Sequence, residues 1–317
     1  MKKVAVGVIG AGVLGGFHLR KCLANGFVEC VGFHDSNARR AQEVSLQLQL
    51  PALGVQELLD RCEAVIVAIP CSEHLRVGRI CLQQAKHVLM EKPLAASYEE
   101  GCELVRLAAE KNLVLHVGHS ELFNPAFRQL LAMKPQPRFL EIHRLSAFSH
   151  RGTDVSVVLD LMVHDLHLLL RLCDEEPVHA NIAATGVAVV SPDIDIANVR
   201  IPFPSGCAAN LTASRISLKK MRKVRIFQKD NYFSVDLDSR RIDHCFLNRE
   251  STEAFPIAVK SHEPEAQDAL EAEQKSFIDA LGHNDGIFAT TGNEALRVLR
   301  TTDAIMNKLQ EETHTKQ

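Results

Sequence analysis

The chain has 317 residues, of which 46% are hydrophobic and 24% charged, and this composition excludes a disordered or collagen-like protein. Its 36 basic residues are outnumbered by 39 acidic ones, which argues against nucleic acid as a partner, because proteins that bind the phosphate backbone usually carry a basic excess. Nine scattered cysteines, the lack of a long apolar run and a strand predicted from the very N-terminus indicate a cytoplasmic protein with reduced thiols and no membrane partner.

Apolar runs alternate with helical segments over about the first 120 residues. The runs are typical of strands buried on both faces, and they lie at residues 4–9, 28–33, 64–69, 87–90 and 114–117. Helices are expected between them, among others at residues 17–24, 38–48, 55–59 and 98–111. This alternation predicts an α/β fold with a doubly wound parallel sheet, and we assign residues 1–121 to a first domain built on that sheet.

The pattern changes in residues 122–317, which we assign to a second, α+β domain. Longer and often alternating strands are expected at residues 138–148 and 178–247, with a very apolar helix at about 155–172 between them. Further helices are expected at residues 125–133, 265–281 and 293–309. Strands that follow one another without intervening helices predict a mostly antiparallel open sheet with helices on one face.

A glycine-rich turn follows the first predicted strand and opens the first helix, with the sequence Gly10-Ala11-Gly12-Val13-Leu14-Gly15. Gly10 permits the tight turn, Gly12 lets the backbone approach a pyrophosphate, and Gly15 lets the helix pack closely on the sheet. The start of the helix, with Val13 and Leu14, offers N–H groups and a partial positive charge to phosphates. We expect these residues to bind a dinucleotide; a turn that serves only the chain geometry is the alternative.

The second predicted strand ends near Asp35, twenty residues after Gly15. A carboxylate at this position accepts hydrogen bonds from ribose hydroxyls and repels a 2′-phosphate, which favours NAD over NADP as the cofactor. Arg39 lies close enough in sequence to contact the cofactor, and it keeps NADP open as the alternative.

Two more loops follow predicted strands, at the edge where parallel sheets bind ligands. Pro70 and His74 lie in the first loop, and Glu91 and Lys92 lie in the second. Pro93 restricts the backbone of Lys92 to an extended conformation, which favours a fixed position for its ammonium group. We expect both loops to contact the cofactor, and an exposed Glu-Lys pair is the alternative for the second.

Three polar side chains interrupt the very apolar helix at Asp160, His164 and His167. Their spacing places them on one face, where a carboxylate four residues before an imidazole suits acid–base chemistry. The alternative is a structural role, in which these core side chains form hydrogen bonds with neighbouring backbone groups. A zinc site built from the same three residues is not favoured, since no cysteine or glutamate ligand stands nearby, and we expect no metal.

Over essentially its whole length the chain resembles the Gfo/Idh/MocA family of NAD(P)-dependent oxidoreductases. The resemblance rests on the glycine turn, on Glu91-Lys92-Pro93 after a strand, and on Asp160-Leu-Met-Val-His164 on a later helix. It implies that Lys92, Asp160 and His164 form the catalytic set. It also implies that residues 1–121 form a dinucleotide-binding Rossmann domain. The second domain, residues 122–317, then binds the substrate, and its open sheet builds homodimers or homotetramers.

The implied reaction is hydride transfer between a sugar hydroxyl carbon and nicotinamide. In this mechanism His164 takes the hydroxyl proton, Asp160 orients the imidazole, and Lys92 stabilises negative charge on the reacting oxygen.

A finer resemblance concerns the substrate. Residues 117–125 and 157–166 are similar to members of the family that oxidise a nucleotide sugar, UDP-N-acetylglucosamine, at its 3-position. This implies substrate contacts from Lys92, His164, Glu121 and Asn124, and Arg215 is a candidate for the diphosphate. The alternatives are a dehydrogenase of a free polyol, inositol or aldose, and a non-catalytic NAD-binding sensor.

Overall fold

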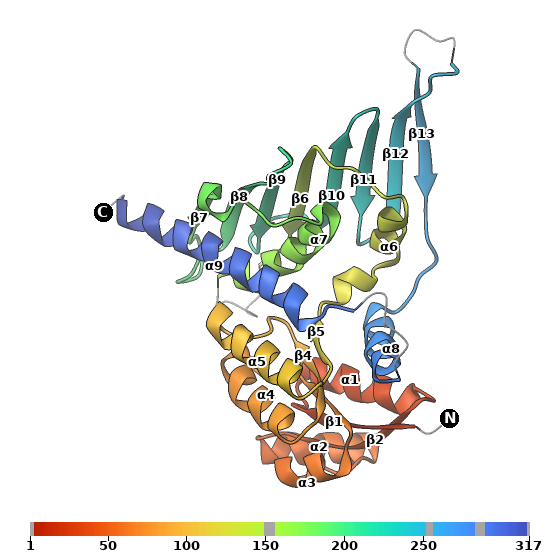
Figure 1. The fold of residues 1–317 in the computed structure, drawn as a ribbon, viewed down its shortest axis with the longest axis vertical. Coiled ribbons are helices and arrows are strands. Elements are labelled where there is room, and N and C mark those ends of the chain that lie inside the picture. Colours follow the sequence, from red (N-terminus) through yellow and green to blue (C-terminus); the bar gives the residue numbers. More distant parts are fainter. Residues whose placement is uncertain (1–2, 149–155, 252–255, 283–288, 316–317) are drawn as a thin grey trace. The chain divides into compact units, whose positions relative to one another are not determined.

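The computed structural model describes residues 3–148, 156–251, 256–282 and 289–315 (Figure 1). The chain divides into two compact units. The first unit comprises Met1–Ser120 and Asp268–Leu299, and the second comprises Glu121–Gln267 and Arg300–Gln317. No helix in the described ranges is both long and apolar enough to cross a membrane.

The first unit is built on a parallel sheet of five strands in the order β2-β1-β3-β4-β5. These strands are β1 (Val4–Ile9), β2 (Val28–His34), β3 (Ala64–Val67), β4 (His87–Glu91) and β5 (Leu115–Gly118). Ala52 forms a single parallel bridge to Phe33 of β2, at the position that a sixth strand would occupy at this edge of the sheet. With that bridge counted, the strand order is the one that binds dinucleotides where it reverses, between β1 and β3.

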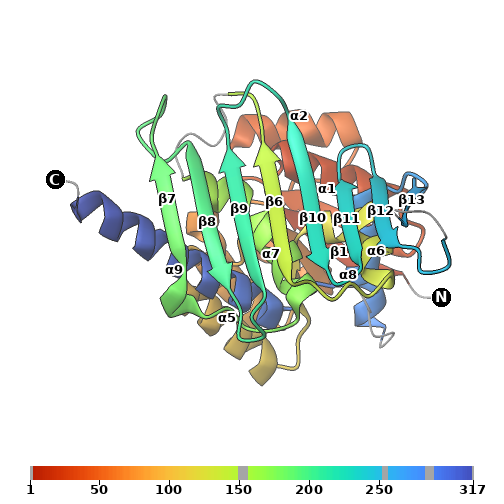
Figure 2. The same cartoon turned by 90° about the horizontal axis from the view of Figure 1, so that it is seen from above.

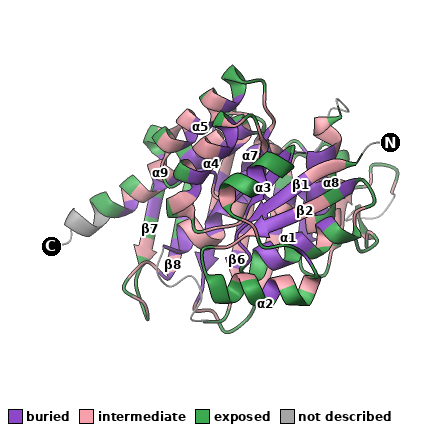
Figure 3. Cartoon of the chain, turned by 90° about the horizontal axis from the view of Figure 1, so that it is seen from below, coloured by how far each residue is buried: buried purple, intermediate pink, exposed green. Residues whose placement is uncertain are grey.

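Helices cover this sheet because its strands are apolar on both faces, as the four buried residues of β3 illustrate. Figure 3 shows β1 mostly in the colour of buried residues. The helices are α1 (Val13–Ala24), α2 (Ala38–Leu48), α3 (Val55–Arg61), α4 (His74–Gln83), α5 (Tyr98–Glu110) and α8 (Ala269–Leu281). Asn37 caps α2 and Ser97 caps α5, each accepting a backbone N–H three residues on. The predicted α/β class with a doubly wound parallel sheet is thereby confirmed.

Residues 268–299 fall in the first unit, whereas the sequence pattern placed them with the second domain. Helix α8 packs into the core of the first unit through Phe277 and Ile278. The backbone near Thr290 continues this attachment, since Val117 of β5 donates to the Thr290 oxygen at 2.9 Å. Helical periodicity predicts an apolar face on such a segment, but it does not identify the sheet that this face covers.

The second unit is built on an eight-stranded sheet in the order β13-β12-β11-β10-β6-β9-β8-β7. Its strands are β6 (Phe139–Leu145), β7 (Ala183–Val187), β8 (Ile196–Pro202), β9 (Ala208–Ser214), β10 (Met221–Gln228), β11 (Asn231–Asp236), β12 (Arg241–Leu247) and β13 (Ile257–His262). Only the β6–β9 pair is parallel among these neighbours, so the predicted mostly antiparallel sheet is confirmed.

One face of this sheet carries helices and the other is open, as the view onto the open face shows (Figure 2). The covering helices of the unit include α6 (Pro125–Ala132) and α7 (Val163–Cys173). Strand β6 alternates accordingly, with Leu140 and Ile142 buried and Glu141 and His143 partly exposed. The last helix, α9 (Gly292–Thr315), starts in the first unit and ends in the second.

The helix expected at about residues 155–172 is divided into two parts. A π-helical turn spans Val158–Met162 and leads into α7, while residue 155 lies outside the described residues. Strand β13 was not expected from the sequence, because its residues are mostly exposed and lack a buried alternate face.

A buried ion pair fastens α7 to the sheet of the second unit. Arg144 of β6 donates to Asp165 of α7 through Nε and Nη2 at 2.8–3.1 Å, and its Nη1 donates to Glu121 at 2.9 Å. Arg144 and Asp165 are only 4% and 2% exposed, so water does not solvate either charge. The two charges therefore depend on each other for compensation.

Asp165→Ala leaves the Arg144 guanidinium buried without its main counter-charge, and we expect the free energy of unfolding to fall by about 3–5 kcal/mol. Urea unfolding followed by circular dichroism measures this loss. Glu43→Ala is the control, since it breaks an exposed pair with Arg39 and should leave the unfolding midpoint nearly unchanged. Similar small shifts in both variants would contradict the assignment of Arg144–Asp165 as a stabilising pair.

Candidate active site

The glycine turn has the geometry of a phosphate cradle. Gly10 has a φ of +94°, which favours glycine, and a Cβ at Gly15 would lie 1.9 Å from the Gly10 oxygen. A Cβ at Gly12 would meet nothing within 4 Å, so the space beside this backbone is open. Helix α1 begins at the next residue without a side-chain cap, and its first N–H groups are therefore available to a ligand.

A pocket of about 430 Å³ lies beside this turn, at the carboxyl ends of β1, β2 and β3. It is lined by Ile9, Gly10, Gly12, His34, Asp35, Ser36, Val55, Ala68, Ile69, Pro70, Glu73, Arg76, Val77 and Ile80. The pocket thus brings together four residues predicted to bind the cofactor: Gly10, Gly12, Asp35 and Pro70. Its apolar walls and the fixed carboxylate of Asp35 fit an adenosine group with its ribose.

Backbone hydrogen bonds fix the carboxylate of Asp35. Its Oδ2 accepts from the Ala11 N–H at 2.7 Å, and its Oδ1 accepts from the Asn37 N–H at 2.8 Å. The first bond ties the end of β2 to the glycine turn after β1. Each oxygen keeps a further lone pair for a ribose hydroxyl.

Two turns of α4 contribute pocket residues that the sequence did not single out. Arg76, Val77 and Ile80 line the wall at helical spacing, and Arg76 pairs with Glu73 at 2.6 Å. In the sequence, the sign that these residues share one face is their i, i+1, i+4 spacing after the loop at Pro70. It was not distinctive, because any amphipathic helix shows it.

Arg39 and His74 are not among the residues that line this pocket. The Arg39 side chain is 89% exposed and pairs with Glu43 rather than lining the pocket. His74 is buried, with Nδ1 2.8 Å from the Pro93 oxygen and Nε2 3.0 Å from the Ile69 oxygen. Burial lowers the pKa of His74. Its ring joins the loop after β3 to the loop after β4, so cofactor contact by these two residues stays a prediction.

The segment Glu91–Lys92 lies at the carboxyl end of β4, the strand between β3 and β5. Glu91 is buried, and its carboxylate faces the interior of the unit. Lys92 is half-buried, and its positive charge acts on His119, where burial first and this charge second lower the pKa to about 3. The ammonium of Lys92 is therefore close to a histidine that stays neutral.

Asp160 and His164 both lie at the start of the long apolar segment in the second unit. Asp160 is in the π-helical turn and His164 is in the first turn of α7, and both are half-buried, while His167 is buried. A π-helical turn is less favourable than α-helix and occurs frequently at functional sites. This local irregularity was not visible in the sequence pattern.

The side chains of Glu121, Asn124 and Arg215 are engaged within the second unit. Glu121 Oε1 accepts from Arg144 and from Arg222, at 2.9 and 3.1 Å. Asn124 caps α6 through its oxygen and donates to the Leu237 oxygen at 2.9 Å. Arg215 is 3% exposed, and its Nη2 donates to the Ile194 oxygen at 3.5 Å. These contacts account for the three residues structurally, and their contact with substrate stays a prediction.

Gly12→Ala fills the open space beside the glycine turn, and we expect it to keep the fold but to weaken NAD binding by about tenfold or more, a cost of about 1.4 kcal/mol. Isothermal titration with NAD measures this effect. Gly15→Ala is the contrasting variant, because its Cβ meets the Gly10 carbonyl and should lower the melting temperature itself. Unchanged NAD affinity in Gly12→Ala would show that no phosphate lies against this backbone.

Comparison with known proteins adds a family to this geometry. The sequence pattern of an oxidoreductase family with an NAD-binding Rossmann fold, Gfo/Idh/MocA, matches residues 4–119. The chain is 36% identical over 291 residues to UDP-N-acetylglucosamine 3-dehydrogenase of Acidithiobacillus ferrooxidans, covering 91% of this chain and 92% of that protein.

A solved structure of the same A. ferrooxidans enzyme superposes with a TM-score of 0.90 at 34% identity, covering 98% of this chain and 99% of the other. Inositol 2-dehydrogenase of Mycolicibacterium smegmatis is 28% identical over 188 residues, which is 56% of this chain and 54% of that protein. The fold, the dinucleotide pocket and these similarities agree, and the chain belongs to the Gfo/Idh/MocA family of NAD-dependent oxidoreductases.

Proposed function

We propose that this oxidoreductase oxidises the 3-hydroxyl of UDP-N-acetylglucosamine to a ketone with NAD as the hydride acceptor. The observation that carries the proposal is the similarity to UDP-N-acetylglucosamine 3-dehydrogenase along nearly the full length of both chains. A similarity that includes the second unit supports a shared substrate class more strongly than a match of the Rossmann unit, which many different dehydrogenases share.

The proposed catalytic set is Lys92, Asp160 and His164. NAD, when bound, accepts a hydride from the carbon that is oxidised. His164 takes the proton of the reacting hydroxyl as general base, and Asp160 orients its imidazole. The Lys92 ammonium donates a hydrogen bond to the same oxygen and stabilises the negative charge that develops there. The hydride and the proton together account for the two hydrogens lost by the alcohol.

The substrate experiment uses purified protein with NAD and follows NADH at 340 nm. We expect NADH from UDP-N-acetylglucosamine and none from free N-acetylglucosamine or myo-inositol at equal concentration. UDP-N-acetylglucosamine deuterated at C3 should transfer its deuterium to the reduced cofactor, which fixes the position of oxidation. Turnover of inositol in place of the nucleotide sugar would support the polyol alternative, towards which the partial similarity to inositol 2-dehydrogenase points.

The variants Lys92→Met and His164→Gln test the proposed catalytic residues in the same NADH assay. Each removes one proton-handling group, so kcat should fall by about 10²–10⁴-fold while the Kd for NADH stays within a factor of two. Glu43→Ala serves again as the control, since its side chain is exposed on α2. Full activity in both Lys92 and His164 variants would refute the mechanism, and turnover of no sugar by the unchanged protein would favour an NAD-binding sensor.

We further propose a cytoplasmic homodimer or homotetramer that pairs through the open face of the eight-stranded sheet. All nine cysteines are free thiols, which is typical of a protein in a reducing compartment.

On the open face an apolar row crosses six strands through directly paired residues: Val259, Cys245, Tyr232, Phe227, Phe139 and Ala208. Phe227 contacts the rings of Phe139 and Tyr232, at 5.6 and 4.9 Å between centroids. Such a row is more apolar than an ordinary solvated strand face.

Phe227→Arg places a charge in the middle of this row, and we expect it to convert the oligomer to a monomer without loss of secondary structure. Light scattering after size exclusion measures the mass, and Asn198→Arg on the same sheet is the control, since Asn198 is exposed outside the row. A monomeric unchanged protein would overturn the proposal.

A further inference from the structure

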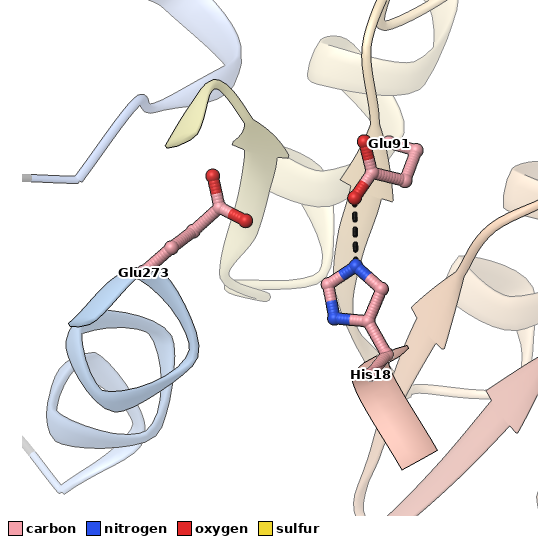
Figure 4. A group of neighbouring side chains, drawn as sticks. All are labelled: His18, Glu91 and Glu273. Carbon is pink, nitrogen blue, oxygen red and sulfur yellow. Dashed lines mark hydrogen bonds and ion pairs between the residues drawn. The ribbon is translucent and has the colours of Figure 1, made fainter. Parts of the chain in front are cut away.

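Four side chains from three distant segments meet behind the loop that carries Lys92, and Figure 4 shows three of them, His18, Glu91 and Glu273. They are His18 of α1, Glu91 at the end of β4, and Glu273 and Gln274 of α8. All four are buried, with His18 at 0% exposure, so none of them is accessible to substrate. Charged or polar groups in such a place need partners, and their hydrogen bonds can be followed from one end to the other.

The amide of Gln274 is oriented by two contacts besides the imidazole. Its Nε2 donates to the backbone oxygen of His18 at 3.2 Å, and its Oε1 accepts from the Cys22 thiol at 3.8 Å. The NH₂ group therefore faces His18. Because that same Nε2 lies 2.7 Å from His18 Nδ1, Nδ1 accepts this hydrogen bond and carries no proton of its own.

The proton of the neutral imidazole is consequently on Nε2, which lies 2.7 Å from Glu91 Oε1 and donates to it. The other oxygen of Glu91, Oε2, accepts the backbone N–H of Lys92 at 3.3 Å. Gly118 of β5 closes the third side, since a Cβ there would lie 3.0 Å from the Glu91 carboxylate. The carboxylate is thus held between α1, β5 and the backbone of the residue proposed to act on the substrate.

We propose that His18, set in one tautomer by Gln274, is a positioning residue that fixes the Glu91 carboxylate and through it the backbone of Lys92. The proposal rests on the proposed role of Lys92 in the reaction. A displacement of about 1 Å in a catalytic group is enough to cost on the order of 10²-fold in rate, so a buried contact behind the loop can control turnover without touching the substrate.

Glu273 is the fourth side chain of the cluster. Neither of its oxygens has a hydrogen-bond partner among the described residues, although the side chain is 3% exposed and points towards His18 and Glu91 (Figure 4). Burial, and then the charge of Glu91, raise the pKa of Glu273 well above its usual range. A raised pKa favours the protonated form of Glu273, in which it does not compete with Glu91 for the Nε2 proton.

A divalent cation is the competing occupant of this cluster. One ligand atom each from His18, Glu91 and Glu273 lie within 4.8 Å of one another, and an imidazole with two carboxylates suits several metals. A metal ligand needs an unprotonated Nε2, however, and the orientation of Gln274 places the proton on that atom. The hydrogen bonds therefore favour the positioning role over a metal centre.

The kinetic test compares His18→Leu, which removes the donor, with His18→Gln, whose amide N–H replaces Nε2–H. We expect kcat with the nucleotide sugar to fall by about 10²-fold in His18→Leu and to recover most of the loss in His18→Gln. The Kd for NADH, read from cofactor fluorescence in a chain without tryptophan, should change less than twofold. His87→Asn at the opposite end of β4 is the control. Equal kcat in His18→Leu and the unchanged protein would overturn the proposal.

A second measurement does not depend on turnover. In protein labelled with ¹⁵N-histidine, the His18 signal, assigned by its loss in His18→Leu, should show the neutral Nε2–H tautomer at pH 7. Glu273→Gln should keep this tautomer, since glutamine resembles the uncharged acid. An Nδ1–H tautomer, or one equivalent of metal in the purified protein that Glu273→Gln removes, would overturn the proposal and assign the cluster to a metal ion. If the tautomer is as expected but no sugar is oxidised, the proposed function fails and the hydrogen-bond assignment stands.

Discussion

The close approach of α1 to the sheet of the first unit is the constraint on which its chemistry depends. Only glycine at position 15 allows it, because any Cβ there would collide with the carbonyl of Gly10. The approach aims the N-terminus of α1 at the dinucleotide pocket. It also brings His18, one turn further along the helix, within 2.7 Å of Glu91. One helix thus borders the dinucleotide pocket at its start and the loop that carries Lys92 along its side.

Each unit holds a buried ionisable side chain by contacts with polar partners. Arg144 is surrounded by Asp165 and Glu121 in the second unit, and Glu91 is bound by His18 and the Lys92 backbone in the first. A buried charge without a partner lowers the stability of the folded state by an amount on the order of several kcal/mol. Such pairs hold the loops and helices that carry proposed functional groups in one geometry.

Local sequence patterns predict much of the first unit. The alternation of apolar runs and helices predicts the parallel sheet, and the spacing of Gly10, Gly12, Gly15 and Asp35 predicts the pocket that the structure contains. These succeed because a βαβ unit imposes its constraints within about forty residues of one another. The βαβ constraints do not determine the partner of a long, flexible side chain such as that of Arg39. In the structure this partner is Glu43, on the exposed surface of the same helix.

The sequence by itself determined the class of fold, the dinucleotide turn and the residue types from which a dehydrogenase site is made, because each depends on neighbours in the chain. Only the tertiary structure decided that α8 belongs to the first unit, that Glu121 and Asn124 are engaged by the second, and that Gln274 orients His18, 256 residues away. Periodicity shows that a face is apolar or polar, whereas the identity of the group that meets it is set by packing between segments far apart in sequence.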